Sequence, residues 1–161
     1  MRSRLRRSWA FSIAVALTAS LVAIASTPAQ ADGLAVAGPQ AAAAPHIRFD
    51  TEGMGPTGDR YIAVYIDGHY AGQVFWNSDP WQNLKGDTVY AQDARADGYG
   101  ITGRVYRNGS LIATATTSGH NAPYTASKSN NIAENVAVTV VASVVKGGTT
   151  YANSAAYSGR S

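Results

Sequence analysis

Strict alternation of apolar and polar side chains is the clearest pattern in this chain. In residues 60–66, Arg60 is followed by a strict alternation in which isoleucine or valine occupies positions 62, 64 and 66, and tyrosine or alanine occupies positions 61, 63 and 65. A period of two is typical of a β-strand with one buried face. Asp67-Gly68 follows, a dipeptide that tolerates the positive φ angles of a tight hairpin turn. The pattern therefore predicts a hairpin whose second strand covers Tyr70–Asn77.

Similar patterns continue towards the C-terminus. Asn108-Gly109, the strongest hairpin signal in the chain, and Gly147-Gly148 each separate two runs typical of strands. The further predicted strands are Asp87–Gln92, Gly100–Arg107, Ser110–Thr117, Asn135–Lys146 and Thr149–Tyr157, with His46–Asp50 as a leading edge strand. Seven or eight strands joined by hairpins predict an all-β fold. We expect an antiparallel β-sandwich of immunoglobulin-like type, with a small β-barrel as the alternative.

The N-terminus has the pattern of a cleavable export signal. Four arginines without an acidic residue precede an apolar stretch, and Ala29-Gln30-Ala31 has the small side chains that signal peptidase requires. We expect cleavage of residues 1–31, with an uncleaved membrane anchor as the alternative. Residues 32–45 are rich in alanine and contain two prolines, which predicts a flexible leader. Residues 46–161 then form a single β-sandwich domain.

Removing the signal peptide changes the charge of the protein. The chain has thirteen lysine and arginine residues against ten acidic residues, but four of the arginines lie within residues 1–31. The mature chain then has nine basic and ten acidic residues, so nothing points to nucleic acid or a membrane surface as a partner. The chain contains no cysteine, and its stability must come from a hydrophobic core. We expect a secreted protein, extracellular or associated with the cell wall.

Motifs of the common catalytic classes are absent from the sequence. The chain has no Gly-x-Ser-x-Gly elbow, no cysteine nucleophile and three histidines without the spacing of zinc ligands. Paired carboxylates of the glycosidase kind cannot be assigned without a cleft. We therefore expect a protein that is not an enzyme.

Connections alternate between the two ends of an antiparallel sandwich, and this alternation predicts which loops meet. Counting from the strand at residue 60, one end receives residues 67–69, residues 93–99 and the long connection Ser118–Glu134. We call it the first end. Its candidate ligand-binding residues are Tyr99, His120, Asn121 and Tyr124.

Asp93 and Asp97, also at the first end, form a candidate calcium site. Two carboxylates around a turn that Gly98 permits offer oxygen ligands for this cation. The spacing is not that of an EF-hand loop. Aspartate and glycine in loops also form turns through local hydrogen bonds, and that simpler interpretation stays open.

The opposite end is predicted to receive residues 77–85, Asn108-Gly109 and Gly147-Gly148. Its candidate ligand-binding residue is Trp81, since a flat exposed aromatic ring stacks on a sugar ring. The alternative is that Trp81 folds back over the open end of the sandwich, and that Tyr61 and Tyr65 merely cover a sheet face.

Three segments of the chain resemble small secreted proteins of actinobacteria. They are Asp93-Ala-Arg-Ala-Asp-Gly-Tyr-Gly100, Gly119-His-Asn-Ala-Pro-Tyr124 and Val144-Val-Lys-Gly147. Those proteins also carry an Ala-Asp-Gly-Tyr-Gly-like turn and a Lys-Gly hairpin near the C-terminus. The resemblance covers about residues 60–157 and implies export and a β fold. It carries over no activity and no functional residue.

These features lead to three hypotheses of function. The first is a secreted, non-enzymatic module that binds an extracellular glycan or cell-wall polymer. The second is a protein-interaction module, such as an inhibitor whose Ser118–Glu134 loop enters a partner's cleft, because loops beyond about 12–15 residues tend to be functional or disordered. The third is a hydrolase without a known motif. They predict, respectively, a coplanar strip of exposed aromatic rings, a protruding rigid loop, and a deep pocket that holds a histidine close to an aspartate.

Overall fold

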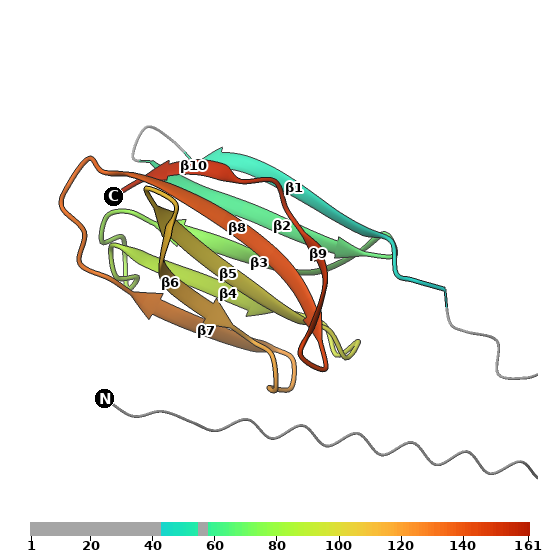
Figure 1. Ribbon diagram of the computed structural model, residues 1–161. Coiled ribbons are helices and arrows are strands. Elements are labelled where there is room, and N and C mark those ends of the chain that lie inside the picture. Colours follow the sequence, from blue (N-terminus) through green and yellow to red (C-terminus); the bar gives the residue numbers. More distant parts are fainter. Residues whose placement is uncertain (1–42, 55–57) are drawn as a thin grey trace, which may run out of the picture. The chain divides into compact units, whose positions relative to one another are not determined.

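The computed structural model of the chain describes residues 43–54 and 58–161, which form ten strands and no helix (Figure 1). The first antiparallel sheet contains, in spatial order, β1 (Ile47–Met54), β2 (Asp59–Ile66), β3 (His69–Asn77), β4 (Thr88–Asp93) and β7 (Tyr124–Ser129). The second contains β10 (Tyr157–Arg160), β8 (Ala137–Lys146), β5 (Gly100–Arg107) and β6 (Ser110–Thr116), with β9 (Thr149–Asn153) also paired to β8. The predicted signal peptide and residues 32–42 of the predicted leader lie outside the described residues.

The two sheets form a sandwich with immunoglobulin-like connections. The chain crosses from β4 to β5, returns from β6 to β7, and crosses again to β8. As a result β7 pairs with β4 in one sheet, while β8 pairs with β5 in the other. These interlocked pairs correspond to strands B and E, and C and F, of an immunoglobulin-like domain. The predicted β-sandwich is confirmed, and the alternative of a closed barrel is wrong, because no pairing among the described strands joins the two sheets.

Alternating side chains from both sheets form one core. Ile62, Val64 and Ile66 of β2 are buried as their spacing predicts, and they belong to one core cluster with buried residues of β5 and β8. Trp76 of β3 is fully buried and donates a hydrogen bond from Nε1 to the Arg160 carbonyl oxygen at 2.7 Å. This bond ties the first sheet to β10 of the second sheet.

Gly103 of β5 lies where the two sheets approach each other closely. A Cβ atom at this position would lie 2.8 Å from methyl groups of both Val74 and Val89. We expect Gly103→Ala to destabilise the fold by about 1–3 kcal/mol, the usual cost of overpacking a core. Urea denaturation measures this change. Thr114→Ala, on the exposed side of the neighbouring β6, is the control and should stay within about 0.5 kcal/mol of the parent. Equal stability of the two variants would contradict the tight contact.

The structure has more strands than the seven or eight predicted. β7 lies inside the segment predicted to be a long loop, and the predicted strand Thr149–Tyr157 is interrupted to give β9 and β10. β9 and β10 follow each other along the same edge of β8. No helix in the described part of the chain is long and apolar enough to cross a membrane.

Candidate functional site

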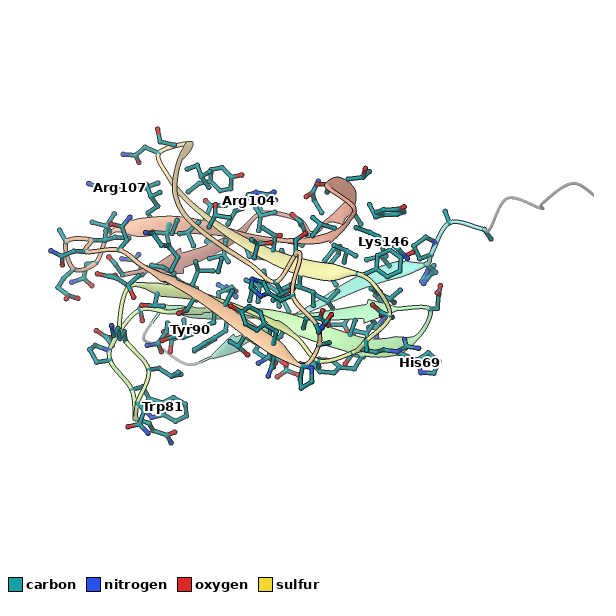
Figure 2. All side chains as sticks on the ribbon, turned by 90° about the horizontal axis from the view of Figure 1, so that it is seen from below. His69, Trp81, Tyr90, Arg104, Arg107 and Lys146 are labelled. Carbon is teal, nitrogen blue, oxygen red and sulfur yellow. The ribbon has the colours of Figure 1, made fainter. Side chains whose placement is uncertain are left out.

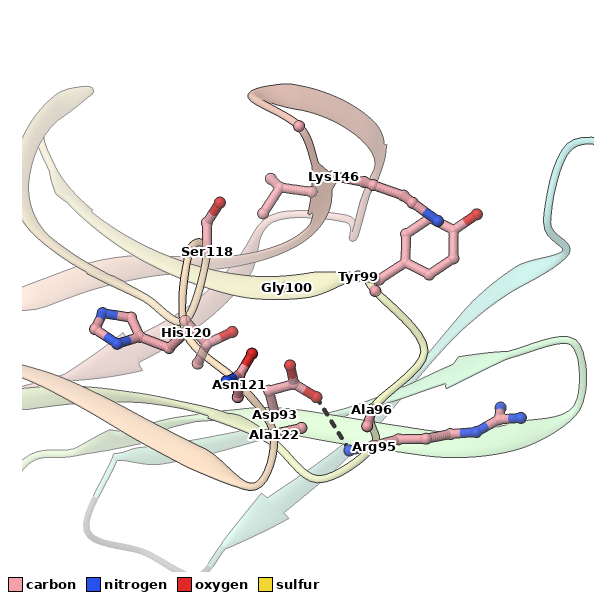
Figure 3. A pocket seen from close by; sticks show the side chains of 15 residues that line it. Asp93, Arg95, Ala96, Tyr99, Gly100, Ser118, His120, Asn121, Ala122 and Lys146 are labelled. Carbon is pink, nitrogen blue, oxygen red and sulfur yellow. Dashed lines mark hydrogen bonds between the residues drawn. The ribbon is translucent and has the colours of Figure 1, made fainter.

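A pocket of about 480 Å³ opens at the first end of the sandwich (Figure 3). We call it the end pocket. Three connections form its walls: the one between β4 and β5, the one between β6 and β7, and the turn between β8 and β9. The polar and aromatic side chains that line it include Asp93, Tyr99, Ser118, His120, Asn121 and Lys146.

Four residues that the sequence singled out at the first end, Asp93, Tyr99, His120 and Asn121, therefore line one pocket. Tyr124 does not line it, but the Tyr124 ring stacks on the His120 ring with centroids 3.9 Å apart and planes 8° from parallel. Asp97 lies in the same connection as Asp93 without lining the pocket.

Asp93, at the end of β4, is buried to 4% exposure. Its Oδ1 accepts a hydrogen bond from the Arg95 backbone N–H at 3.0 Å, which begins the turn into β5. Burial raises the pKa of the Asp93 carboxyl, and the nearby Asp97 carboxylate raises it further, while the hydrogen bond from Arg95 opposes them. A buried carboxylate with a raised pKa at a pocket wall is the kind of group found at functional sites.

Asp97 has the contacts of a turn-forming residue. Its Oδ1 accepts the Tyr99 backbone N–H at 3.0 Å, and Gly98 follows with a φ of 78°. Its Oδ2 lies 4.0 Å from the Arg95 guanidinium. Nowhere in residues 43–54 and 58–161 do three or more His, Cys, Asp or Glu side chains gather as a metal-binding group. Calcium binding by Asp93 and Asp97 stays a prediction.

The connection between β6 and β7 is held in place by Thr117. The buried Thr117 Oγ1 accepts a hydrogen bond from the Ile101 N–H at 2.8 Å, and the Thr117 carbonyl accepts one from the His120 N–H at 3.1 Å. Gly119, with a φ of 87°, makes the turn between them. The backbone thereby presents His120 and Asn121 at the pocket.

Lys146 is a pocket residue that the sequence analysis missed. Its Nζ lies 4.4 Å from the centre of the Tyr99 ring, a cation–π contact, and the Tyr99 ring packs edge-on against Tyr151. Lys146 precedes the Gly147-Gly148 turn, which was predicted at the opposite end. That prediction is wrong because β7 adds one strand and so reverses the direction of the strands that follow it. Recognising β7 in the sequence would have placed Lys146 correctly.

Trp81 lies at the other end of the sandwich from His69 and Lys146 (Figure 2). It is 55% exposed, so it does not cover the open end of the sandwich. The Trp81 and Leu84 backbones form a small bridge, and Gln82 between them has a φ of 53°. The side chain thus stands at the tip of a tight turn, away from the end pocket.

The segment Ser118–Glu134 is not a single protruding loop. Its residues 124–129 form β7, which pairs with β4 along its whole length. The Asn130 N–H donates to the Asp87 carbonyl, and the Ile132 N–H donates to the Asp87 carboxylate, so the second part also follows the domain surface. This geometry differs from the protruding loop that the inhibitor hypothesis required.

His120 does not face an aspartate in the way that the hydrolase hypothesis required. The His120 ring stacks on Tyr124, and Figure 3 shows it turned away from Asp93. No hydrogen bond joins a histidine side chain to a carboxylate among the residues that the structure describes.

Comparisons with protein-family models, with curated proteins and with solved structures find no match for this chain. The resemblance to small secreted actinobacterial proteins therefore stays a prediction.

Proposed function

We propose that this protein is a secreted, non-enzymatic binding module and that its end pocket holds one unit of an extracellular glycan. The observation that carries the proposal is the meeting of Asp93, Asn121 and Lys146 with the Tyr99 and His120 rings around one pocket. A volume of about 480 Å³ lies within the range of small-ligand sites, which is roughly 300–1,000 Å³.

The chemistry of the pocket walls favours a polyhydroxylated ligand. Figure 3 shows Asp93 and Asn121 together on one side and Lys146 with Tyr99 on the other. A carboxylate accepts hydrogen bonds from hydroxyl groups, an amide both accepts and donates, and an ammonium donates. Because two of these groups are charged, their hydrogen bonds are stronger than those between neutral partners. The aromatic rings at the pocket supply flat apolar surface beside these polar groups.

The location of the pocket favours the end of a chain or a side branch as the bound unit. Connections between strands wall the pocket, while the strands themselves run away from it. A long polymer lying flat on the domain would contact the sheet faces instead. We therefore expect the end pocket to bind a single sugar unit.

Co-sedimentation of the purified exported protein with insoluble chitin, cellulose and peptidoglycan tests the proposal. We expect one polymer to pellet the protein. Asn121→Ala, an exposed pocket residue, should weaken binding by about 0.5–1.5 kcal/mol, roughly two- to tenfold, through the loss of a neutral hydrogen bond. Trp81→Ala, at the other end, is the matched control and should bind like the parent.

Two outcomes contradict the proposal. If no polymer pellets the protein, the glycan hypothesis fails and a protein partner becomes the better hypothesis. If Trp81→Ala loses binding while Asn121→Ala keeps it, a glycan binds at the opposite end and the end pocket is not the site.

A further inference from the structure

A second hollow, of about 300 Å³, lies on the outer face of the first sheet. We call it the tyrosine hollow. The residues that line it all lie on β1 and β2: Asp50, Glu52, Tyr61, Ala63 and Tyr65. The two strands run side by side at the edge of the sheet (Figure 1).

The hollow follows directly from the register of these two strands. Tyr61, Ala63 and Tyr65 point outward because Ile62, Val64 and Ile66 fill the core. Two tyrosines at positions i and i+4 of a strand are about 13 Å apart along it. The small Ala63 side chain between them forms the floor of the hollow. Asp50 lies opposite Ala63 and Glu52 opposite Tyr61, so carboxylates form the neighbouring wall.

The Tyr65 ring is held in place without a ligand. Tyr65 packs edge-on against Tyr70, with ring centroids 5.8 Å apart. The Tyr70 hydroxyl donates a hydrogen bond to Gln73 Oε1 at 2.8 Å. Partial burial, followed by interaction with Tyr61, raises the pKa of the Tyr70 phenol. A site with fixed rings loses less conformational entropy on binding.

The charges around the hollow are not balanced. Arg48 pairs with Asp50 and does not line the hollow. Glu52 is exposed, and none of the ion pairs found among the described residues involves it. The Glu52 carboxylate and the Tyr61 ring therefore face the space without a cation among the described residues, while the Arg48 guanidinium lies over the Tyr65 ring.

Arg48 of this chain already makes a cation–π contact and an ion pair beside the hollow. Its guanidinium lies 4.2 Å from the centre of the Tyr65 ring while pairing with the Asp50 carboxylate. Cations are attracted to the faces of aromatic rings, and aromatic cages recognise quaternary ammonium groups in this way. An anionic ligand would be repelled by Asp50 and Glu52.

We propose that the tyrosine hollow binds an organic ammonium group, held by the Tyr61 and Tyr65 rings above Ala63 and paired with Glu52. The size of the hollow, at the lower limit of roughly 300–1,000 Å³ for ligand sites, suits a head group. The site is independent of the end pocket and of the glycan proposed there. Two sources carry this chemistry: quaternary ammonium compounds and protonated amino sugars.

Isothermal titration of the full chain at low salt tests the site with four probes. Choline and glucosamine represent the two cationic sources. Their neutral counterparts are 3,3-dimethyl-1-butanol, which has the shape of choline without its charge, and N-acetylglucosamine. We expect one of the two cations to bind and its neutral counterpart to bind at least about tenfold more weakly. Binding of choline alone assigns a quaternary ammonium, and binding of glucosamine alone assigns an amino sugar.

Three variants locate the binding. Ala63→Leu fills the floor of the hollow from the outer face of the sheet and should abolish binding. Glu52→Gln keeps the size of an exposed side chain, removes its charge and should weaken binding by about tenfold. Glu134→Gln, an exposed acid in the connection between β7 and β8, is the matched control and should change nothing. The proposal is overturned if neither cation binds, if a neutral probe binds as well as its cation, or if Ala63→Leu and Glu52→Gln bind like the parent.

Discussion

Asp93→Asn is expected to stabilise the fold and to weaken glycan binding in the end pocket. The carboxylate of Asp93 is almost fully buried, and burial raises its pKa. The folded protein therefore disfavours the ionised form of Asp93. Asparagine has the same shape, carries no charge and can still accept the Arg95 N–H hydrogen bond through Oδ1.

The pH dependence of stability distinguishes this cause from other effects of the substitution. Because the pKa of Asp93 is higher in the folded than in the unfolded state, the folded state binds more protons between the two values. Stability therefore falls as pH rises from the ordinary aspartate value, about 3.9, through the folded pKa. The Asp93→Asn variant has no carboxyl group at this position, so it lacks this fall in stability with rising pH. Its advantage in urea denaturation should be largest at neutral pH and should shrink as pH falls towards about 4.

Binding should change in the opposite direction. A hydrogen bond to a charged group contributes about 1.5–3 kcal/mol, so Asp93→Asn should weaken binding of the pelleting polymer by roughly ten- to a hundredfold. Asp97→Asn is the matched control, because Asp97 lies in the same connection but does not line the pocket. If Asp93→Asn lowers stability and leaves binding unchanged, Asp93 is a structural residue of the turn and does not belong to the site.

A stabilising substitution that costs binding is the expected signature of a functional site. Stabilising substitutions recurrently cost function where a binding or active site contains a group that destabilises the folded state. If Asp93 were needed for the turn alone, Asn would serve equally well, because Asn and Asp both form such turns.

The strands with a buried face were predictable, and the strand without one was not. Residues 60–66 and 100–107 alternate clearly, and both form strands close to the predicted limits. β7 has the sequence Tyr-Thr-Ala-Ser-Lys-Ser, and Ala126 is its one residue in the partly buried class. This edge strand consists mostly of polar residues and is held in place by backbone pairing with β4, so its sequence has no periodic apolar pattern.

The missing strand had a consequence for the candidate site. Alternation of connections correctly brought residues 93–99 and His120 to one end, because β3 to β6 were all recognised. Past β7 the same counting placed Lys146 at the wrong end. One unrecognised strand reverses the count for the elements that follow it, even when their limits are predicted well.

The tyrosine hollow shows a different limit of sequence analysis. Alternation alone places Tyr61, Ala63 and Tyr65 on one face of a strand. It does not tell which residues of β1 lie beside them, because register depends on the whole pairing of the sheet. A shift of one residue in β1 would have placed Phe49 and Thr51 beside them in place of Asp50 and Glu52. The charge of the hollow is thus a property of the folded sheet.

Trp76→Ala is expected to have the largest effect on stability of any substitution described for this protein. Trp76 is fully buried between the sheets, and its indole N–H donates to the Arg160 carbonyl at 2.7 Å. Gly159 of β10 lies so close that a Cβ atom there would be 3.2 Å from Trp76 Cδ1. Truncation therefore creates a cavity and removes a link between β3 and β10. We expect a loss of about 3–5 kcal/mol.

Such a loss is large for a domain of this size. Total stability of natural domains is about 5–15 kcal/mol, and this chain has no disulfide that would limit unfolding. Urea denaturation followed by circular dichroism measures the effect without relying on the removed fluorophore. Trp81→Ala is the matched control: the same side chain is removed from a site that is 55% exposed, so stability should stay within about 0.5 kcal/mol of the parent. Similar losses in both variants would mean that Trp76 does not lie in the core, since burial is the main difference between the two positions.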